Sequence, residues 1–231
     1  MSVAVEPLVI DVATIDSWHA APAGASPVVL VEPLYGSVAV GLALDAGWGS
    51  VELAPGLESA APIPLVSFEV PAPAVEGDAD RRCRVRSTDL HAAARCVEGA
   101  GAVLVGSIAN ARPLASRLAT LLEACERVTF LLAPSGDTTL TSDAAWASGV
   151  LIRILLEELE RASALTDAAG IAVTLAQGAE DPAAQLTAGT RWTRHLEGGG
   201  NADDLRVAGS VDTIGAVPRL HVEGDALVAR A

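Results

Sequence analysis

The sequence contains no lysine, and this absence excludes two kinds of chemistry. All fifteen basic residues among the 231 are arginine. Without a lysine the protein cannot form a lysine Schiff base with a substrate, and it lacks the P-loop lysine that binds nucleotide phosphates. We attribute the exclusive use of arginine to codon bias in a GC-rich genome rather than to anion recognition.

Positive charge, aromatic residues and cysteine are also scarce. Twenty-nine acidic residues against fifteen basic ones give a formal net charge of −14, and aromatics make up 3% of the chain. The negative charge argues against nucleic acid and against an anionic lipid surface as partners. Cys83, Cys96 and Cys125 are scattered and form no C-x-x-C motif, which predicts reduced thiols in a cytosolic protein.

Long apolar runs are missing, although 51% of the residues are hydrophobic. The most apolar stretch, residues 28–48, is interrupted by residues such as Glu32 and Asp45, and no segment reaches the roughly 18 apolar residues of a spanning helix. The N-terminus has Glu6 and no basic region before an apolar run, unlike a secretory signal. We therefore expect a cytoplasmic protein with no membrane partner.

Strand-like and helix-like segments alternate along the chain, which predicts a layered α/β architecture in one domain over residues 1–231. The expected strands are 27–32, 48–53, 82–86, 102–105 and 128–133, and the expected helices are 37–46, 88–98, 111–125, 142–162 and 167–176. Residues 54–80 are rich in proline, alanine and acidic side chains and are expected to be an irregular connection, with one short strand at 64–70. Residues 217–230 are expected to form a terminal hairpin around a Glu-Gly-Asp turn.

The most informative stretch is residues 103–111, where an apolar strand is followed by Gly106, Ser107 and Asn110. A glycine permits a sharp turn, and the serine and asparagine side chains are good helix caps. Such a junction between a strand and a helix exposes backbone N–H groups to anionic ligands in open α/β proteins.

Together with two other segments, this stretch resembles the 2-phosphosulfolactate phosphatase family, whose members are magnesium-dependent phosphatases. The second segment is residues 132–149, where a glycine-containing loop is followed by a helix rich in small residues, and the third is the tail from Asp203 to Leu220. The resemblance implies a three-layer α/β/α fold around a mixed, largely parallel sheet.

The resemblance also implies a Mg²⁺ site and an anion site. Glu32 stands where the family has an aspartate, so Glu32 and Asp143 are the expected metal ligands, and Asp143 and Asp89 are the expected catalytic carboxylates. The expected substrate-binding side chains are hydroxyls and one amide, from Ser37, Ser87, Thr88, Ser107, Asn110 and Ser135. Each has a structural alternative: Glu32 can simply end a strand, and Ser87–Asp89 and Ser142–Asp143 can cap the helices that follow them.

Three departures from the family pattern keep two functions open. Tyr35 stands in place of an arginine, Leu90 in place of a glycine, and Ser142 in place of a glutamate. The first hypothesis is a Mg²⁺-dependent phosphatase acting on a small phosphorylated hydroxy acid, 2-phosphosulfolactate or a related compound. The alternative is a degenerate or repurposed member that binds a small ligand or partner without hydrolysis. The alanine-rich helix around residues 146–156 suggests a homo-oligomer as well.

Overall fold

A computed structural model of the chain describes residues 6–18, 26–55, 81–179, 181–197 and 200–231. Most of the expected irregular connection, including the expected strand at 64–70, lies outside these described residues.

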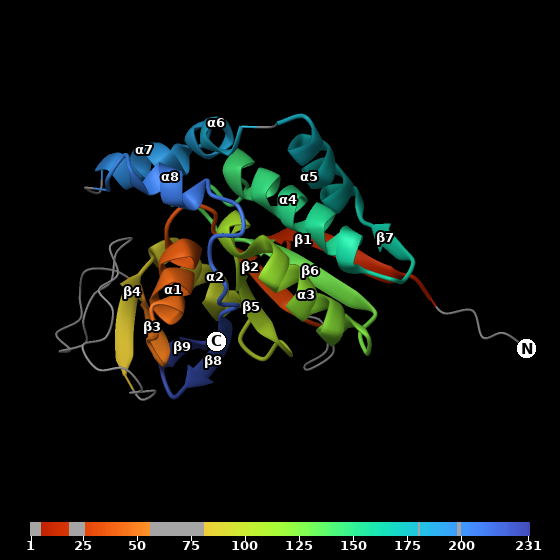
Figure 1. The fold of residues 1–231 in the computed structure, drawn as a ribbon, viewed down its shortest axis with the longest axis horizontal. Coiled ribbons are helices and arrows are strands. Elements are labelled where there is room, and N and C mark those ends of the chain that lie inside the picture. Colours follow the sequence, from red (N-terminus) through yellow and green to blue (C-terminus); the bar gives the residue numbers. More distant parts are fainter. Residues whose placement is uncertain (1–5, 19–25, 56–80, 180, 198–199) are drawn as a thin grey trace, which may run out of the picture.

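Strands and helices alternate as the sequence predicts (Figure 1). The strands are β1 (Leu8–Thr14), β2 (Val28–Val31), β3 (Ser50–Ala54), β4 (Arg82–Arg86), β5 (Val103–Gly106), β6 (Arg127–Leu132), β7 (Ser163–Leu165), β8 (Arg219–Glu223) and β9 (Ala226–Arg230). The helices are α1 (Gly36–Asp45), α2 (Thr88–Cys96), α3 (Ala111–Leu122), α4 (Ser142–Glu158), α5 (Asp167–Gln177), α6 (Pro182–Thr187), α7 (Thr190–Glu197) and α8 (Asp204–Ala208), with a 3₁₀ turn at Ile108–Asn110.

The described strands form one mixed sheet in the order β4-β3-β9-β8-β5-β2-β6-β1-β7. All pairings are parallel except those of the β8–β9 hairpin, which is inserted between β3 and β5 and is antiparallel to both. Val31 of β2 pairs with Gly106 of β5 on one side and with Leu132 of β6 on the other. The loops that follow these three strands therefore leave the sheet at the same level.

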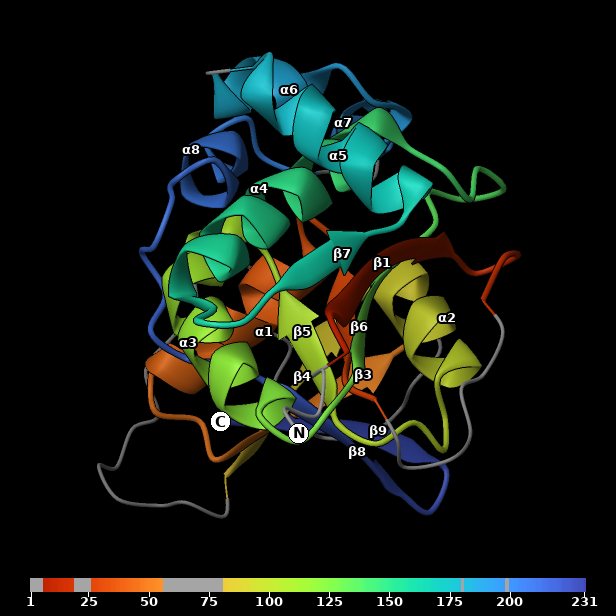
Figure 2. The same cartoon turned by 90° about the vertical axis from the view of Figure 1, so that its right-hand side faces the viewer.

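Side chains of the central strands alternate between two apolar cores on opposite faces of the sheet. Val29 and Val31 contribute to a core with α3, α4 and α5, whereas Val28 and Leu30 contribute to a core with α2 and most of α1. Figure 2 shows the sheet lying between α3 and α4 on one side and α2 on the other. The predicted three-layer α/β/α fold is therefore confirmed.

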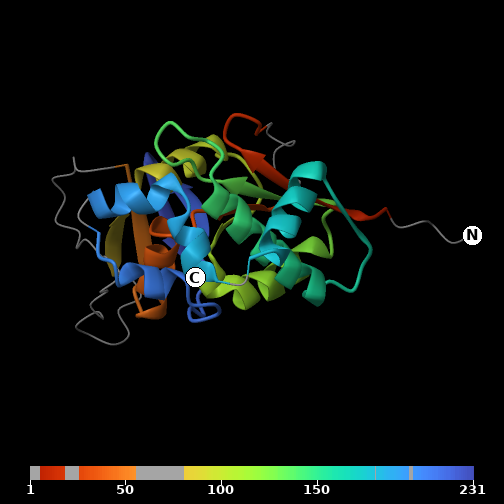
Figure 3. The same cartoon turned by 90° about the horizontal axis from the view of Figure 1, so that it is seen from above.

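Short helices cover the edge of the sheet at which β2, β4 and β6 end. Figure 1 shows α6, α7 and α8 across this edge, and Figure 3 looks down on them from above. In the part of the chain that the structure describes, no helix is both long and apolar enough to cross a membrane.

Two differences from the sequence-based expectations concern the edge of the sheet. The strand β1 was not expected, although Leu8 and Ile10, two residues apart, are buried on one face and Ala13 on the other, as in a strand. The predicted helix over 142–162 ends at Glu158, because Leu159 adopts an extended conformation that leads into β7. The β7 strand then pairs with β1.

The apolar face of α4 packs against other elements of the same chain. Trp146, Leu151 and Leu155 are buried in the core that α4 shares with α3 and α5. The expectation that this helix packs against a second copy of the chain stays a prediction.

Candidate active site

Glu32 follows β2 directly and caps the helix α1. Its carboxylate accepts backbone N–H groups from four residues, at 3.4 Å from Leu34, 3.1 Å from Tyr35 and 3.3 Å from Ser37, with Gly36 as the fourth donor. The first N–H groups of a helix have no partner within the helix and carry partial positive charge, so a buried carboxylate is stabilised there. These four N–H groups hold the Glu32 carboxylate in place although only 2% of the residue is exposed.

The loop after β2 also touches the start of α2. A Cβ atom added at Gly36 would lie 2.7 Å from the Cβ of Ser87 and 2.8 Å from Oε2 of Glu32. Only a glycine permits this close approach. It brings the end of β4, which is far from β2 in the strand order, to the same place as the end of β2.

Arg191 of α7 lies between the three acidic residues that the sequence singles out. Its Nε atom donates to Asp143 at 2.9 Å, and its Nη1 atom lies 3.1 Å from Asp89 and 3.4 Å from Glu32. The same guanidinium donates to the main-chain carbonyls of Ala133 and Pro134, at 2.9 and 3.0 Å. One side chain thus connects the ends of β2 and β6 with the beginnings of α2 and α4.

A second arginine of α7 reaches the outer side of this cluster. Nη1 of Arg194 lies 3.2 Å from Oδ2 of Asp89 and 3.0 Å from the hydroxyl of Ser135. The backbone N–H of Gly136 donates to the other oxygen of Asp89 at 3.2 Å. Asp89 is therefore held between two guanidinium groups and the loop that follows β6.

The three carboxylates differ in exposure, and this difference separates their roles. The side chain of Asp143 is fully buried and that of Glu32 is 2% exposed, whereas that of Asp89 is 16% exposed. Of these three, Asp89 is the one that a molecule arriving from solvent can touch. Asp143 and Glu32 instead hold Arg191, and the Oδ1 atom of Asp143 is buried without a hydrogen-bond partner among the described residues.

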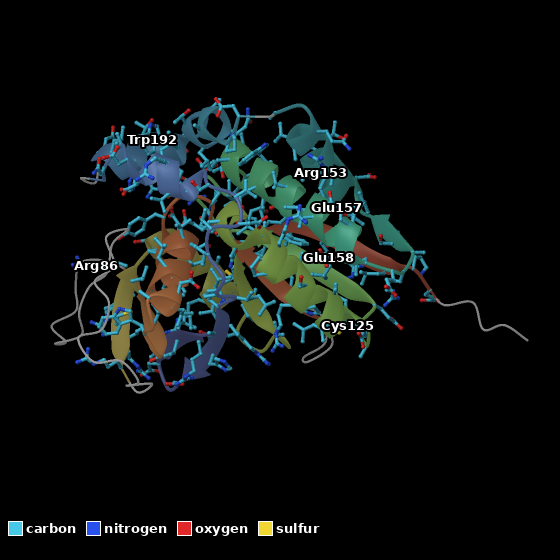
Figure 4. The ribbon with its side chains drawn as sticks, viewed as in Figure 1. Arg86, Cys125, Arg153, Glu157, Glu158 and Trp192 are labelled. Atoms are coloured by element: carbon cyan, nitrogen blue, oxygen red, sulfur yellow. The ribbon has the colours of Figure 1, made fainter. Side chains whose placement is uncertain are left out.

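Aromatic side chains form a wall beside the cluster. The ring of His195 lies 5.7 Å from the rings of both Tyr35 and Trp192, and its Nε2 atom is 2.8 Å from Asp204. Burial, followed by the negative charges of Glu32 and Asp204, raises the pKa of the Tyr35 phenol. Tyr35 is therefore neutral at neutral pH. Figure 4 shows Trp192 above the sheet and Arg86 at the end of β4 that faces α7.

The expected substrate-binding side chains are only partly brought together. Ser135 contacts Arg194 at the cluster, and Ser37 lies beside Glu32, with its hydroxyl accepting the Glu32 N–H at 3.3 Å. The Ser87 hydroxyl caps α2 by accepting the N–H of Leu90, and that of Thr88 donates to the carbonyl of Pro55.

Ser107 and Asn110 are bonded to each other rather than to the cluster. The Ser107 N–H donates to the Asn110 side chain at 2.9 Å, and the Asn110 amide donates to the carbonyls of Val105 and Ala216. Both residues are buried, and these bonds tie the end of β5 to the segment before β8. Their binding role stays a prediction, whereas their structural role is visible.

The sequence analysis missed Arg191 and Arg194, and it also missed His195. Their spacing of three and four residues places them on one face of a helix, which was the available signal. The sequence analysis defined no individual helix between residues 177 and 200, so this periodicity was not used. In the structure the two arginines of α7 are the cationic partners of the Asp89 carboxylate.

The arrangement of these residues does not fit the expected Mg²⁺ ion. Mg²⁺ requires oxygen ligands at about 2.1 Å in an octahedron and usually keeps several waters, which need space. The guanidinium of Arg191 fills the position between Glu32, Asp89 and Asp143, and the oxygens of Glu32 already accept four N–H groups. Among the described residues, no three acidic, histidine or cysteine side chains are placed to hold one metal ion.

Comparison with known proteins supports the assignment from the residues. A search of curated proteins finds no match. The sequence model of the family described as 2-phosphosulpholactate phosphatase matches residues 69–223, which is more than half of the chain. The matched range contains Asp89, Asp143 and both arginines of α7, whereas Glu32 and Tyr35 precede it. The chain therefore belongs to the 2-phosphosulpholactate phosphatase family.

Proposed function

We propose that the protein hydrolyses the phosphate ester of a small hydroxy acid, 2-phosphosulfolactate or a related compound, at the edge of the sheet under α7. The observation that carries this proposal is the position of Asp89, a partly exposed carboxylate between Arg191 and Arg194. Family membership supports the reaction class. Hydrolysis of a phosphomonoester requires an oriented water and positive charge near the phosphoryl oxygens, and the proposal assigns these roles to Asp89 and Arg194.

Arg194 binds the phosphoryl group in this proposal. Its side chain is 45% exposed, and within the described residues only its Nη1 atom is engaged. The remaining N–H groups of a guanidinium form the planar fork that binds two oxygens of a phosphate or sulfonate. The Ser135 hydroxyl, which contacts Arg194, adds one further donor.

Asp89 orients the attacking water in this proposal. A carboxylate within reach of a water can accept its proton as the bond to phosphorus forms, and such groups contribute about 100-fold or more to the rate. Asp143 and Glu32 are buried and act through Arg191, which they hold in place. The Mg²⁺ ion implied by the resemblance is not part of this proposal, because Arg191 stands between its expected ligands.

Release of inorganic phosphate from 2-phosphosulfolactate and from a panel of phosphorylated hydroxy acids tests the proposal. Asp89→Asn should lower kcat by at least about 100-fold. Asp225→Asn, in the exposed turn between β8 and β9, is the matched control and should leave it unchanged. Each substrate is assayed with added Mg²⁺ and with a chelator. No release from any substrate under either condition would contradict the proposal.

One observation favours the second candidate function, ligand binding without hydrolysis. The cluster contains three carboxylates and two guanidinium groups, so it has one excess negative charge, which disfavours a phosphate dianion. A phosphate group bound there has to rely on Arg194 and main-chain donors. A folded protein that releases no phosphate, and that a ligand screen shows to be stabilised by another small molecule but not by Mg²⁺ or phosphate, would support this alternative.

A further inference from the structure

We infer that Arg191 is the resident cation of this site and excludes a divalent metal ion from it. The inference starts from the three carboxylates of Glu32, Asp89 and Asp143, which surround a single guanidinium at 2.9 to 3.4 Å. Three carboxylates around one guanidinium, two of them nearly or fully buried, would repel one another without a cation between them. In this chain the cation is a side chain of α7.

The guanidinium is fixed in place by more than charge. Both main-chain carbonyls at the end of β6 accept its Nη atoms, so its donors are directed to five different residues of the chain. Only 5% of the Arg191 side chain is exposed. A metal ion entering from solvent would have to displace a buried group in which each of the three nitrogens has an acceptor.

The turn before α7 closes the site from the side of Asp143. A Cβ atom added at Gly189 would lie 3.0 Å from Oδ1 of Asp143, so the main chain passes directly over this oxygen. This oxygen has no hydrogen-bond partner among the described residues. Removal of Arg191 also frees the Oδ2 atom, so both oxygens of Asp143 would then be available to a new cation.

Removing the guanidinium should therefore create a divalent-cation site. Arg191→Ala keeps the three carboxylates and opens the space between them. The carboxylates are not placed around one ion in the present structure, so they have to move toward one another before these hard oxygen ligands bind Mg²⁺ or Mn²⁺. Arg191→Lys keeps a positive charge and should continue to exclude the metal. Neither outcome depends on the substrate, so this inference can fail or succeed independently of the proposed reaction.

The probe is Mn²⁺, whose free form is measured by electron paramagnetic resonance in a phosphate-free buffer. We expect no saturable binding to the wild-type protein or to Arg191→Lys. Arg191→Ala should bind about one Mn²⁺ per chain, at least about tenfold more tightly than any residual binding to the wild-type protein. Arg84→Ala is the matched control. It removes another buried arginine, one that pairs with Glu52, and should gain no Mn²⁺.

Two results would overturn the inference. The first is saturable Mn²⁺ binding by the wild-type protein that Asp143→Asn abolishes, because the ion would then share the site with Arg191. The second is a folded Arg191→Ala protein that binds no Mn²⁺. If Arg191→Ala does not fold, the double variant Arg191→Ala/Asp89→Asn has one carboxylate fewer but keeps Asp143, and it must bind Mn²⁺ more tightly than the wild type does.

Discussion

The Nε atom of Arg191 lies 2.9 Å from the Oδ2 atom of Asp143, and neither side chain is more than 5% exposed. One residue comes from α7 and the other from the first turn of α4, so this ion pair joins the covering helices to the layer beneath them. Burying two charged groups costs more than it returns unless the remaining donors find acceptors. Arg191 meets this condition because, besides Asp143, its guanidinium contacts the carboxylates of Glu32 and Asp89 and two main-chain carbonyls.

Arg191 should contribute much more to stability than its neighbour Arg194. Arg191→Met leaves Glu32 and Asp143 buried without a counter-ion, and breaking such a buried pair costs about 3–5 kcal/mol in the free energy of unfolding. Arg194→Met, the matched control on the same helix, removes a half-exposed partner of Asp89 and should cost at most about 1 kcal/mol. Urea unfolding measures both. Equal losses would show that Arg191 is not held as described.

Arg194 should also contribute to substrate binding, which the KM of the reaction reports. Arg194→Gln should raise KM for the phosphorylated substrate about tenfold, because a charged hydrogen-bonding contact to an anion contributes roughly 1.4 kcal/mol. Arg117→Gln, at an exposed position on α3, is the control and should leave KM unchanged. Initial rates of phosphate release measure this, and an unchanged KM in Arg194→Gln would remove Arg194 from the binding site.

Tyr35 is the single tyrosine of the chain, so its ionisation can be followed alone by ultraviolet absorbance. Its pKa should lie above the ordinary value of 10.0, because burial and then the charges of Glu32 and Asp204 disfavour the phenolate. The unfolded chain therefore loses this proton at lower pH than the folded protein. The contribution to stability is present below pH 10.0 and declines as the pH rises through the folded pKa.

Replacing one of the charged neighbours tests the cause of this shift. Asp204→Asn removes a negative charge near the ring and should lower the pKa of Tyr35 toward 10.0. Asp225→Asn, in the turn between β8 and β9, is the control and should not move it. A titration of the wild-type protein at or below pH 10.0 would contradict the placement of Tyr35 against Glu32.

Two glycines in adjacent helices should respond oppositely to alanine. A Cβ at Gly149 of α4 would lie 1.9 Å from the main-chain oxygen of Ala172 in α5, so Gly149→Ala should destabilise the protein by about 3 kcal/mol. Gly170 of α5 has nothing within 4 Å of the added atom, and Gly170→Ala should stabilise it by about 0.5–1 kcal/mol. Thermal unfolding measures both changes, and a neutral Gly149→Ala would mean that α4 and α5 are not in contact.

The cysteines should differ in reactivity toward a thiol reagent. Burial raises the pKa of the Cys83 thiol to about 12, so it stays protonated and unreactive in the folded protein. Cys96 is exposed and should react first. The test is labelling of the Cys96→Ser variant before and after unfolding in urea. Rapid labelling of Cys83 in the folded state would contradict its position in the core.

The layered fold could be predicted because each layer has its own local signal. Strands such as Val28–Val31 are short apolar runs, and glycine or proline marks their ends, so alternation alone gives most of the order of elements. The strand order could not be predicted, because the insertion of the β8–β9 hairpin between β3 and β5 depends on contacts between residues far apart in the chain. The strand β1 was missed even though its alternation is visible.

The candidate site, too, could be predicted only in part. Glu32, Asp89 and Asp143 could be named because each follows a strand or begins a helix, and such positions meet at one edge of a parallel sheet. Arg191 could not, because it belongs to a helix of eight residues about fifty residues after Asp143 in the chain. Nothing local marks Arg191 as the partner of the three acids. The metal expectation came from the family resemblance and named Glu32 and Asp143 as ligands, without the arginine.

Crystals grown from the wild-type protein and soaked in Mn²⁺ test the central claim most directly, because the anomalous signal locates the metal. We predict continuous density for the Arg191 guanidinium between Glu32, Asp89 and Asp143, and no anomalous peak among these carboxylates. A Mn²⁺ peak at about 2.1 Å from Glu32 and Asp143, with Arg191 displaced into solvent, would contradict it.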